Sequence, residues 1–329
     1  MTGRRIALGL ALAALATLPY WLHGAYYVNV SSQILFYAIF ALGLNILVGY
    51  AGLVSLGHAG LFGLASYGIA YTLAAGFGHP AAVGAALAVG LGGTAVFAAL
   101  SLRATGIGFI MITLALGEIL WGLAYRWISV TQGDNGISVA TRPAPFGLSL
   151  AHAGAFYYAT LAVFLLAVAT FAVFVRSPLG AALKGTRDQP RRMTALGYHV
   201  WMIRFLAFLV SGLLTCAAGI LFVYYTQFIS PQTLALTSSA EVLLMVISGG
   251  AGTLLGPLVG AALVVVVKSV LSAYIQRWNF MLGAIFVAIV IFMPEGIVPG
   301  TVRLSRRALQ AHQHRRRARN AVGRSGMET

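Results

Sequence analysis

Charged side chains inside long apolar runs are the first candidates for chemistry in this chain. Glu118 lies in the middle of TLALGEILW, and Lys268 interrupts the run VVVVKSVL. A charge within hydrocarbon is costly unless it is paired or faces water, so such groups often mark solute or ion pathways. Glu118 is therefore a candidate for ion coupling or for lining a solute path. The simpler interpretation is a protonated or capped structural glutamate.

Two other charged residues have structural interpretations. Glu241 follows Ser238 closely enough to lie in the first turn of a helix, where a carboxylate favours the helix dipole, so we expect it to cap that helix. Lys268 lies toward the outer end of its run, so its ammonium group can extend to the membrane surface. An ion pair between Glu118 and Lys268 is a further alternative.

Polar residues also flank a glycine-rich interruption between two apolar runs. Asn45, Ser55 and His58 surround it, and Thr113 lies in the run that contains Glu118. With Glu118, these residues are our candidates for lining a translocation path. The alternative is that they form hydrogen bonds between helices, which is a common role for polar residues in membrane proteins.

Sequence motifs for catalysis are absent. The chain contains neither HExxH nor GxxxxGK[ST], and no Cys/His cluster has metal-ligand spacing. We therefore expect no ATP hydrolysis by this chain, no metal and no cofactor. Cys216, the one cysteine, lies in an apolar run and is expected to be a packing residue. A membrane-embedded enzyme would need clustered polar residues at a cavity, and the sequence shows none.

The composition indicates which kind of structure holds these residues in place. Of 329 residues, 60% are hydrophobic and 8% are charged, which is far from soluble composition. A crossing needs about 20 apolar residues. We expect an all-α, polytopic transmembrane bundle of about ten spans, the eighth short enough to be a half-helix. The spans are expected near 6–22, 31–49, 54–75, 81–101, 106–127, 154–175, 205–226, 238–249, 256–275 and 279–298.

The basic residues set the orientation. The net charge is +15, and most Lys and Arg gather in the N-terminus, the segment 176–204 and the tail 303–329. Because basic residues concentrate on the cytoplasmic side, both termini and the central segment are predicted to be cytoplasmic, and nucleic acid is not the expected partner. Residues 1–302 form the predicted transmembrane domain, beginning with an uncleaved helix. The tail is expected to be disordered or to contact anionic membrane lipid.

The segment 176–204 is the one long polar interruption among the spans. It carries six basic residues and a single acid, Asp188. So many charges in one internal loop indicate a surface presented to a partner outside the bilayer. The alternative is a loop that is basic only because it is cytoplasmic.

Two glycine-rich stretches resemble each other. LNILVGYAGLVSLGHAG (44–60) can be laid over LMVISGGAGTLLGPLVG (244–260), so that Gly49 and Gly52 fall on Gly249 and Gly252. One interpretation is chance matching in a chain with 39 glycines. The other is a duplicated helix break, which membrane proteins tolerate where backbone is buried or lines a cavity.

Several blocks together resemble the permeases of bacterial branched-chain amino acid ATP-binding-cassette importers. The blocks are FALGLNILVGYAGLVSLGHAGLFGLASYGIAYTLA (40–74), GIGFIMITLALGE (106–118), TQGDNGI (131–137), 177–212 and 229–263. SLGHAG resembles the M-type subunit. Thr131-Gln132-Gly133 departs from the commoner Thr-Gly-Gly. Its loop, with Asp134 and Asn135, is a turn that could contact an external partner.

The resemblance implies several partners: a sister H-type permease, two cytoplasmic ATPases, and a periplasmic or lipid-anchored solute-binding protein in the bacterial inner membrane system. It also implies a single coupling helix from Gly180 to Gly197. The residues expected to contact the ATPase are Gly180, Ala181, Leu183, Lys184, Arg187, Asp188, Arg191, Arg192, Ala195, Leu196 and Gly197. No strong solute site is expected in the permease itself. The alternative function is an ion-coupled secondary transporter that uses Glu118.

Overall fold

The structure is a computed structural model that describes residues 17–19, 24–139, 142, 150, 152–274, 278–292 and 296–300. The predicted span over 6–22 lies almost wholly outside these residues, and the tail 303–329 lies entirely outside them. The described helices are α2 (Ala25–Asn45), α3 (His58–Ala74), α4 (His79–Ser101), α5 (Ile107–Arg126), α6 (Ile128–Thr131), α7 (Ala153–Arg176), α8 (Pro178–Asp188), α9 (Pro190–Ala195), α10 (Val200–Thr226), α11 (Leu236–Gly249), α12 (Gly256–Tyr274) and α13 (Trp278–Phe292).

The helices follow the apolar runs closely, which confirms an all-α membrane architecture. Within the described part of the chain, five helical segments are long and apolar enough to cross a bilayer. They are Ala25–Ala51, His79–Ser101, Ile107–Arg126, Ala153–Arg176 and Val200–Thr226. Ten crossings and the orientation of the termini stay predictions.

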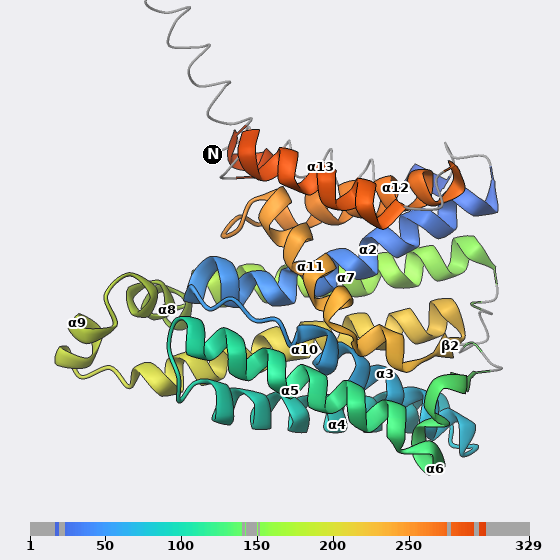
Figure 1. Cartoon of the computed structure of the whole chain (residues 1–329), viewed down its shortest axis with the longest axis horizontal. Coiled ribbons are helices and arrows are strands. Elements are labelled where there is room, and N and C mark those ends of the chain that lie inside the picture. The colour runs from blue at the N-terminus through green and yellow to red at the C-terminus, as the bar shows by residue number, and fades with distance from the viewer. Residues whose placement is uncertain are drawn as a thin grey trace, which may run out of the picture.

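Figure 1 shows an elongated bundle whose long helices run along its length, with α8 and α9 at one end and α6 and β2 at the other. At the second end, β1 (Ile137–Ser138) pairs antiparallel with β2 (Phe228–Ile229). This two-stranded pair is the one described departure from all-helical structure, and it joins the loop after α6 to the end of α10.

Helix α2 lies at the centre of the bundle. It packs against α7, α10 and α12, and 83% of its most apolar stretch is buried, against 22% for α5. Because lipid is as apolar as leucine, such a helix is held by close packing rather than by the hydrophobic effect. Helix α2 is therefore the element against which the others are positioned.

Two helix breaks interrupt the bundle. The π-helix η1 (Ile46–Ala51) extends α2, and the chain then runs without regular structure to α3 at His58, later than the predicted start at 54. The second break follows α11 and ends where α12 begins at Gly256. Gly52 and Gly252, which the two stretches align, both have left-handed backbones (φ 69° and 77°), a conformation that favours glycine. The interpretation of two matching helix breaks agrees with this geometry.

The span predicted over 238–249 is α11, with 14 residues. At 1.5 Å per residue it covers about 21 Å, less than the roughly 30 Å of hydrocarbon. The preceding 3₁₀ helix η4 (Pro231–Leu234) packs against α3 and α5, and a Cβ on Gly63 would meet Leu234. The segment between α10 and α11 therefore returns into the bundle before α11 starts. This arrangement agrees with α11 being a half-helix.

Candidate functional site

The segment predicted as one coupling helix is two helices. Helix α8 ends at Asp188 and α9 begins at Pro190. Proline has no N–H to continue a helix, and it forces the preceding residue out of the helical region, as seen at Gln189 (φ −147°, ψ 80°). The prediction of a single helix over 180–197 is therefore wrong, although the segment is helical and lies at one end of the bundle (Figure 1).

Helix α8 is anchored to the first helix break. Arg187 donates from Nη1 to the carbonyl of Gly49 at 2.7 Å, and the ammonium of Lys184 lies 5.1 Å from the centre of the Tyr50 ring. At the start of the next span, Arg204 donates from Nη2 to the carbonyl of Thr186 at 2.8 Å. These charged contacts join α8 to η1 and to α10, so a displacement of α8 would act directly on both.

Helix α9 is instead exposed, with contacts to α8 and to α10. None of its residues is buried, and Arg191 and Arg192 are both exposed. Leu196, which follows it, is 65% exposed, a large apolar side chain left uncovered beside cationic ones. Exposed apolar and cationic groups on a projecting segment are suited to a protein partner.

Asn45 joins the two helix breaks. Its Oδ1 accepts from the backbone N–H of Gly252 at 2.8 Å, and its Nδ2 donates to the carbonyl of Thr253 at 2.9 Å. The side chain is fully buried. Non-helical backbone within a membrane protein needs internal hydrogen-bond partners, and Asn45 supplies one donor and one acceptor to the second break.

His58 belongs to a buried hydrogen-bonded chain. Its Nδ1 lies 2.9 Å from Oγ of Ser55, and its Nε2 lies 2.9 Å from Oγ of Ser211. Because Ser211 donates its hydroxyl proton to the carbonyl of Gly43 at 2.6 Å, its oxygen must accept from Nε2–H. Nδ1 then accepts from the hydroxyl of Ser55. Both ring nitrogens of His58 therefore have a hydrogen-bond partner.

The remaining path candidates lie apart from one another. Thr113 is buried, and its Oγ1 accepts from the backbone N–H of Leu56, so it supports the first break. Glu118 is exposed on the outer face of α5. The structure thus brings Asn45, Ser55 and Thr113 to the first break but leaves Glu118 outside this group. Their roles in a translocation path stay predictions.

Lys268 and Glu241 form an ion pair that sequence reasoning missed. The Lys268 ammonium lies 3.1 Å from each carboxylate oxygen of Glu241. The proposed pair with Glu118 is wrong. So is capping by Glu241, because α11 begins at Leu236 and places Glu241 beyond the first turn. Lys268 lies about 18 Å along α12 from its start at 1.5 Å per residue, and its ammonium turns to Glu241 rather than to the membrane surface.

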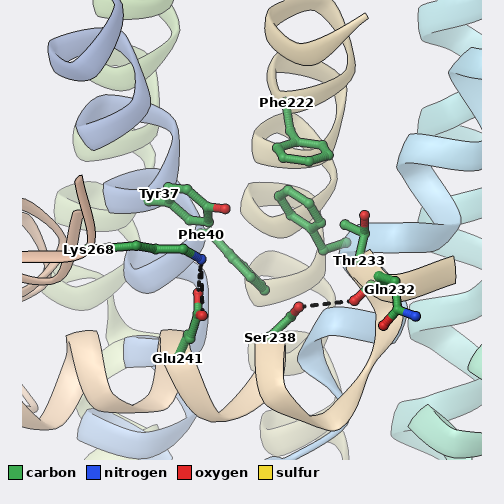
Figure 2. Close-up of a pocket in the computed structure, with 9 residues that line it drawn as sticks. Tyr37, Phe40, Phe222, Gln232, Thr233, Ser238, Glu241 and Lys268 are labelled. Atoms are coloured by element: carbon green, nitrogen blue, oxygen red, sulfur yellow. Dashed lines mark hydrogen bonds and ion pairs between the residues drawn. The ribbon is translucent and has the colours of Figure 1, made fainter. Parts of the chain in front are cut away.

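This ion pair borders a cavity of about 200 Å³ (Figure 2). Tyr37, Phe40, Phe62 and Phe222 give it an aromatic wall, and Figure 2 shows the ion pair beside Tyr37 and Phe40. The other lining residues are polar and come from η4 and α11: Gln232, Thr233 and Ser238. The cavity is thus built where η4 leads into α11, from segments that lie far apart in the sequence.

The loop after α6 contains the predicted turn. Gln132 and the glycines at 133 and 136 have left-handed backbones, and η2 (Gly133–Asn135) lies between them. Gln132 stands where the resemblance leads us to expect glycine, and its φ of 57° explains that preference. Asp134 and Asn135 are exposed. Contact of this pair with a partner stays a prediction.

Sequence reasoning missed two serines, Ser239 of α11 and Ser211 of α10, that support the first break and the start of α3. Ser239 accepts from the backbone N–H of Ala59 at 3.0 Å and so satisfies the first turn of α3, and Ser211 completes the histidine chain. Serines inside apolar runs have no periodic signal of their own. The matching glycine stretches were the one available indication that the two breaks would meet.

These features define a multi-pass membrane protein with paired helix breaks and a basic segment tied to one of them. The comparison with known families agrees: the family described as "Branched-chain amino acid transport system / permease component" matches residues 26–291. The chain belongs to this family. It is a permease component of an ATP-binding-cassette transporter.

Individual relatives agree with this assignment. The chain is 28% identical over 304 residues to the high-affinity branched-chain amino acid transport system permease protein LivM of Escherichia coli (strain K12), covering 83% of this chain and 70% of the relative. The LivM of Salmonella typhimurium is also 28% identical, over 303 residues, with the same coverage. The autoinducer 2 import system permease protein LsrC of Photorhabdus laumondii is 32% identical over 140 residues, 40% of this chain and 41% of the relative. No solved structure matches significantly.

Proposed function

We propose that this chain forms half of the membrane channel of a bacterial inner-membrane importer, which carries branched-chain amino acids or similar small polar solutes into the cytoplasm. The other half is a sister H-type permease. Two cytoplasmic ATPases bind α8 and α9, and a periplasmic or lipid-anchored binding protein delivers the solute. Family membership supports this function over an ion-coupled secondary transporter.

The contact of Arg187 with Gly49 carries the proposal. Helix α8 is fixed to the break that follows α2, while α9 projects into solvent. Movement of an ATPase bound to α9 and to the exposed face of α8 would therefore reach η1 and, through Asn45, the second break. Such a change of helix arrangement, driven by ligands bound elsewhere, is a shift between pre-existing states.

The proposal includes a topology. Residues 1–302 form the permease domain with about ten spans, both termini are cytoplasmic, and the tail 303–329 lies against the inner leaflet. Asn45, Ser55, His58, Thr113 and Glu118 border the path in the assembled channel. Asp134 and Asn135 face the binding protein.

Reversing the charges of α9 is expected to release the ATPases. Arg191→Glu combined with Arg192→Glu places two acids where we propose an interface that accepts cations, and like-charge contacts there cost several kcal/mol. We expect at least about a tenfold loss of co-purified ATPase when the chain is isolated from its native membrane and the eluate is quantified by mass spectrometry. Arg187 is left unchanged because it also holds Gly49.

Arg103→Glu is the matched control, since Arg103 is an exposed cation in the turn after α4. It should leave ATPase recovery at the level of the unmodified chain. Equal ATPase recovery from the α9 variant would contradict docking at α9. A chain that purifies alone, yet transports solute in liposomes under an ion gradient, would overturn the importer itself.

Glu118→Gln separates the importer from the ion-coupled alternative. A secondary transporter that uses this carboxylate for ion coupling should lose gradient-driven uptake completely. In the importer, ATP-driven uptake is expected to stay within about twofold, because ATP hydrolysis rather than the charge of Glu118 drives the cycle and a substitution of an exposed side chain usually costs under about 0.5 kcal/mol of stability. Uptake of labelled solute into proteoliposomes, with ATP or with an ion gradient, measures both.

A further inference from the structure

The ion pair of Lys268 and Glu241 faces an open space. The two side chains are 33% and 21% exposed, and both line the cavity of about 200 Å³. Enclosing an ion pair costs the desolvation of both charges, which their attraction repays only with excellent geometry and full hydrogen bonding. A pair that lines a cavity instead leaves both charges within reach of a small molecule.

The rest of the cavity has an apolar wall on one side and a polar rim on the other. The Phe40 and Phe62 rings stack with centroids 4.6 Å apart, and Phe222 meets Phe62 edge-on at 5.3 Å, so one wall is apolar and rigidly packed. Gln232, Thr233 and Ser238 form the polar rim, and Gln232 is exposed. A charged pair beside an apolar wall matches a molecule with two opposite charges at one end and an apolar group at the other.

We propose that this cavity binds a small zwitterion, in the manner of an α-amino acid with an apolar side chain. Its carboxylate pairs with Lys268 and its ammonium group with Glu241, while its side chain lies against Phe40, Phe62 and Phe222. This deepens the proposed function, on which it rests, and places a solute site within the permease where sequence analysis expected none.

The size of the cavity suits this class of ligand. At about 30 Å³ for each water in the liquid, its volume corresponds to about seven water molecules. Drug-sized ligands occupy roughly 300–1,000 Å³, so the cavity is too small for them. A single amino acid of intermediate size fills such a space.

Charge balance gives the site its selectivity. When a zwitterion binds, the ion pair of Lys268 with Glu241 is replaced by two ion pairs, one between each residue and the ligand. No charge is then left without a partner. A carboxylate without an ammonium group would bind Lys268 and leave Glu241 uncompensated, and an amine would do the reverse. An uncompensated charge in a partly buried site is costly, so each should bind more weakly than the zwitterion.

The site lies between helices that flank both helix breaks, although none of its lining residues belongs to a break. Its lining comes from α2, α3, α10, η4, α11 and α12, which include the helices that begin and end at the breaks. The first turn of α11, with Ser238, faces the cavity, and a helix N-terminus favours the carboxylate end of such a ligand. Occupation of the cavity would thus act on helices that lead into the breaks.

Binding of labelled L-leucine to the permease–ATPase complex, purified without the solute-binding protein and placed in lipid nanodiscs, tests the proposal. The competitors are 4-methylpentanoate, which lacks the ammonium group, and 3-methylbutylamine, which lacks the carboxylate. We expect L-leucine to bind at least about tenfold more tightly than either competitor, because each loses one charged hydrogen-bond partner. No saturable binding of leucine up to about 10 mM, or equal binding of all three, would overturn the inference.

Two variants identify the charges. Glu241→Gln should weaken leucine binding by about 10- to 100-fold and make 4-methylpentanoate the better ligand, because only the ammonium partner is removed. Lys268→Met should do the same in favour of 3-methylbutylamine. A purely structural pair would instead weaken all three ligands alike. Arg103→Met, which removes an exposed cation remote from the lining, is the matched control and should change nothing.

Where single variants fail to fold, the reversed pair Glu241→Lys with Lys268→Glu keeps the cavity neutral and should keep leucine binding within about tenfold. Loss of leucine binding in a folded reversed pair would contradict the site. ATPase recovery in the same preparations separates the two proposals. Normal recovery without leucine binding removes only the cavity site, whereas leucine binding without ATPases removes only the proposed function.

Discussion

Replacing Asn45 with leucine is expected to destabilise the protein by about 2–4 kcal/mol, because the backbone N–H of Gly252 and the carbonyl of Thr253 both lose their partner. Leucine has a similar size, so little of this loss comes from packing. The melting temperature should fall by roughly 5–10 °C. Cys216 is fully buried, so a thiol-reactive dye that becomes fluorescent on reaction with it reports unfolding in detergent.

Asn45→Asp separates the contributions of the two hydrogen bonds. The carboxylate still accepts from Gly252, but it has no proton to donate to Thr253 and instead faces that carbonyl. We expect a loss of stability at least as large as with leucine. Ser31→Ala is the control, since the hydroxyl of Ser31 donates to the carbonyl of Tyr27 within its own helix. An Asn45 variant that melts within about 1 °C of the unmodified chain would show that the breaks do not depend on this amide.

Replacing Gly49 with alanine should separate the two helix breaks. A Cβ at this position would overlap the backbone nitrogen of Gly252, and it would approach within 2.6 Å of the Gly252 Cα. Backbone cannot move aside as a flexible side chain can, so we expect a cost of about 1–3 kcal/mol in stability. Because Arg187 binds the Gly49 carbonyl, the same displacement should uncouple ATP hydrolysis from transport.

The measurement is the ratio of solute imported to ATP hydrolysed in proteoliposomes, together with the melting temperature. Gly92→Ala is the matched control, because nothing lies within 4 Å of a Cβ at Gly92 in α4. Alanine is the better helix former, so this control should be as stable as the unmodified chain or more stable. Normal transport and stability for Gly49→Ala would refute the close packing of the two breaks.

The sequence by itself determined the class of protein and the positions of most helices. Apolar runs of about 20 residues can only be satisfied as helices in lipid, so the predicted runs and the observed helices agree to within a few residues at most ends. The glycine pattern also indicated where the chain breaks, since left-handed backbone at Gly52 and Gly252 favours the one residue without a Cβ. Helix positions and left-handed glycines depend on local sequence, so they could be predicted without knowledge of the tertiary structure.

Tertiary structure alone decided which groups meet. Asn45 and Thr253 are 208 positions apart, and no periodicity in either run indicates the other. The partner predicted for Lys268 from the sequence, Glu118, was wrong for the same reason. Hydropathy shows that a charge lies within the bilayer, but the packing of α11 against α12 selects Glu241 and leaves Glu118 on the outer face of α5. The cavity is a property of six elements together, because its aromatic wall and its ion pair exist only once those elements have packed.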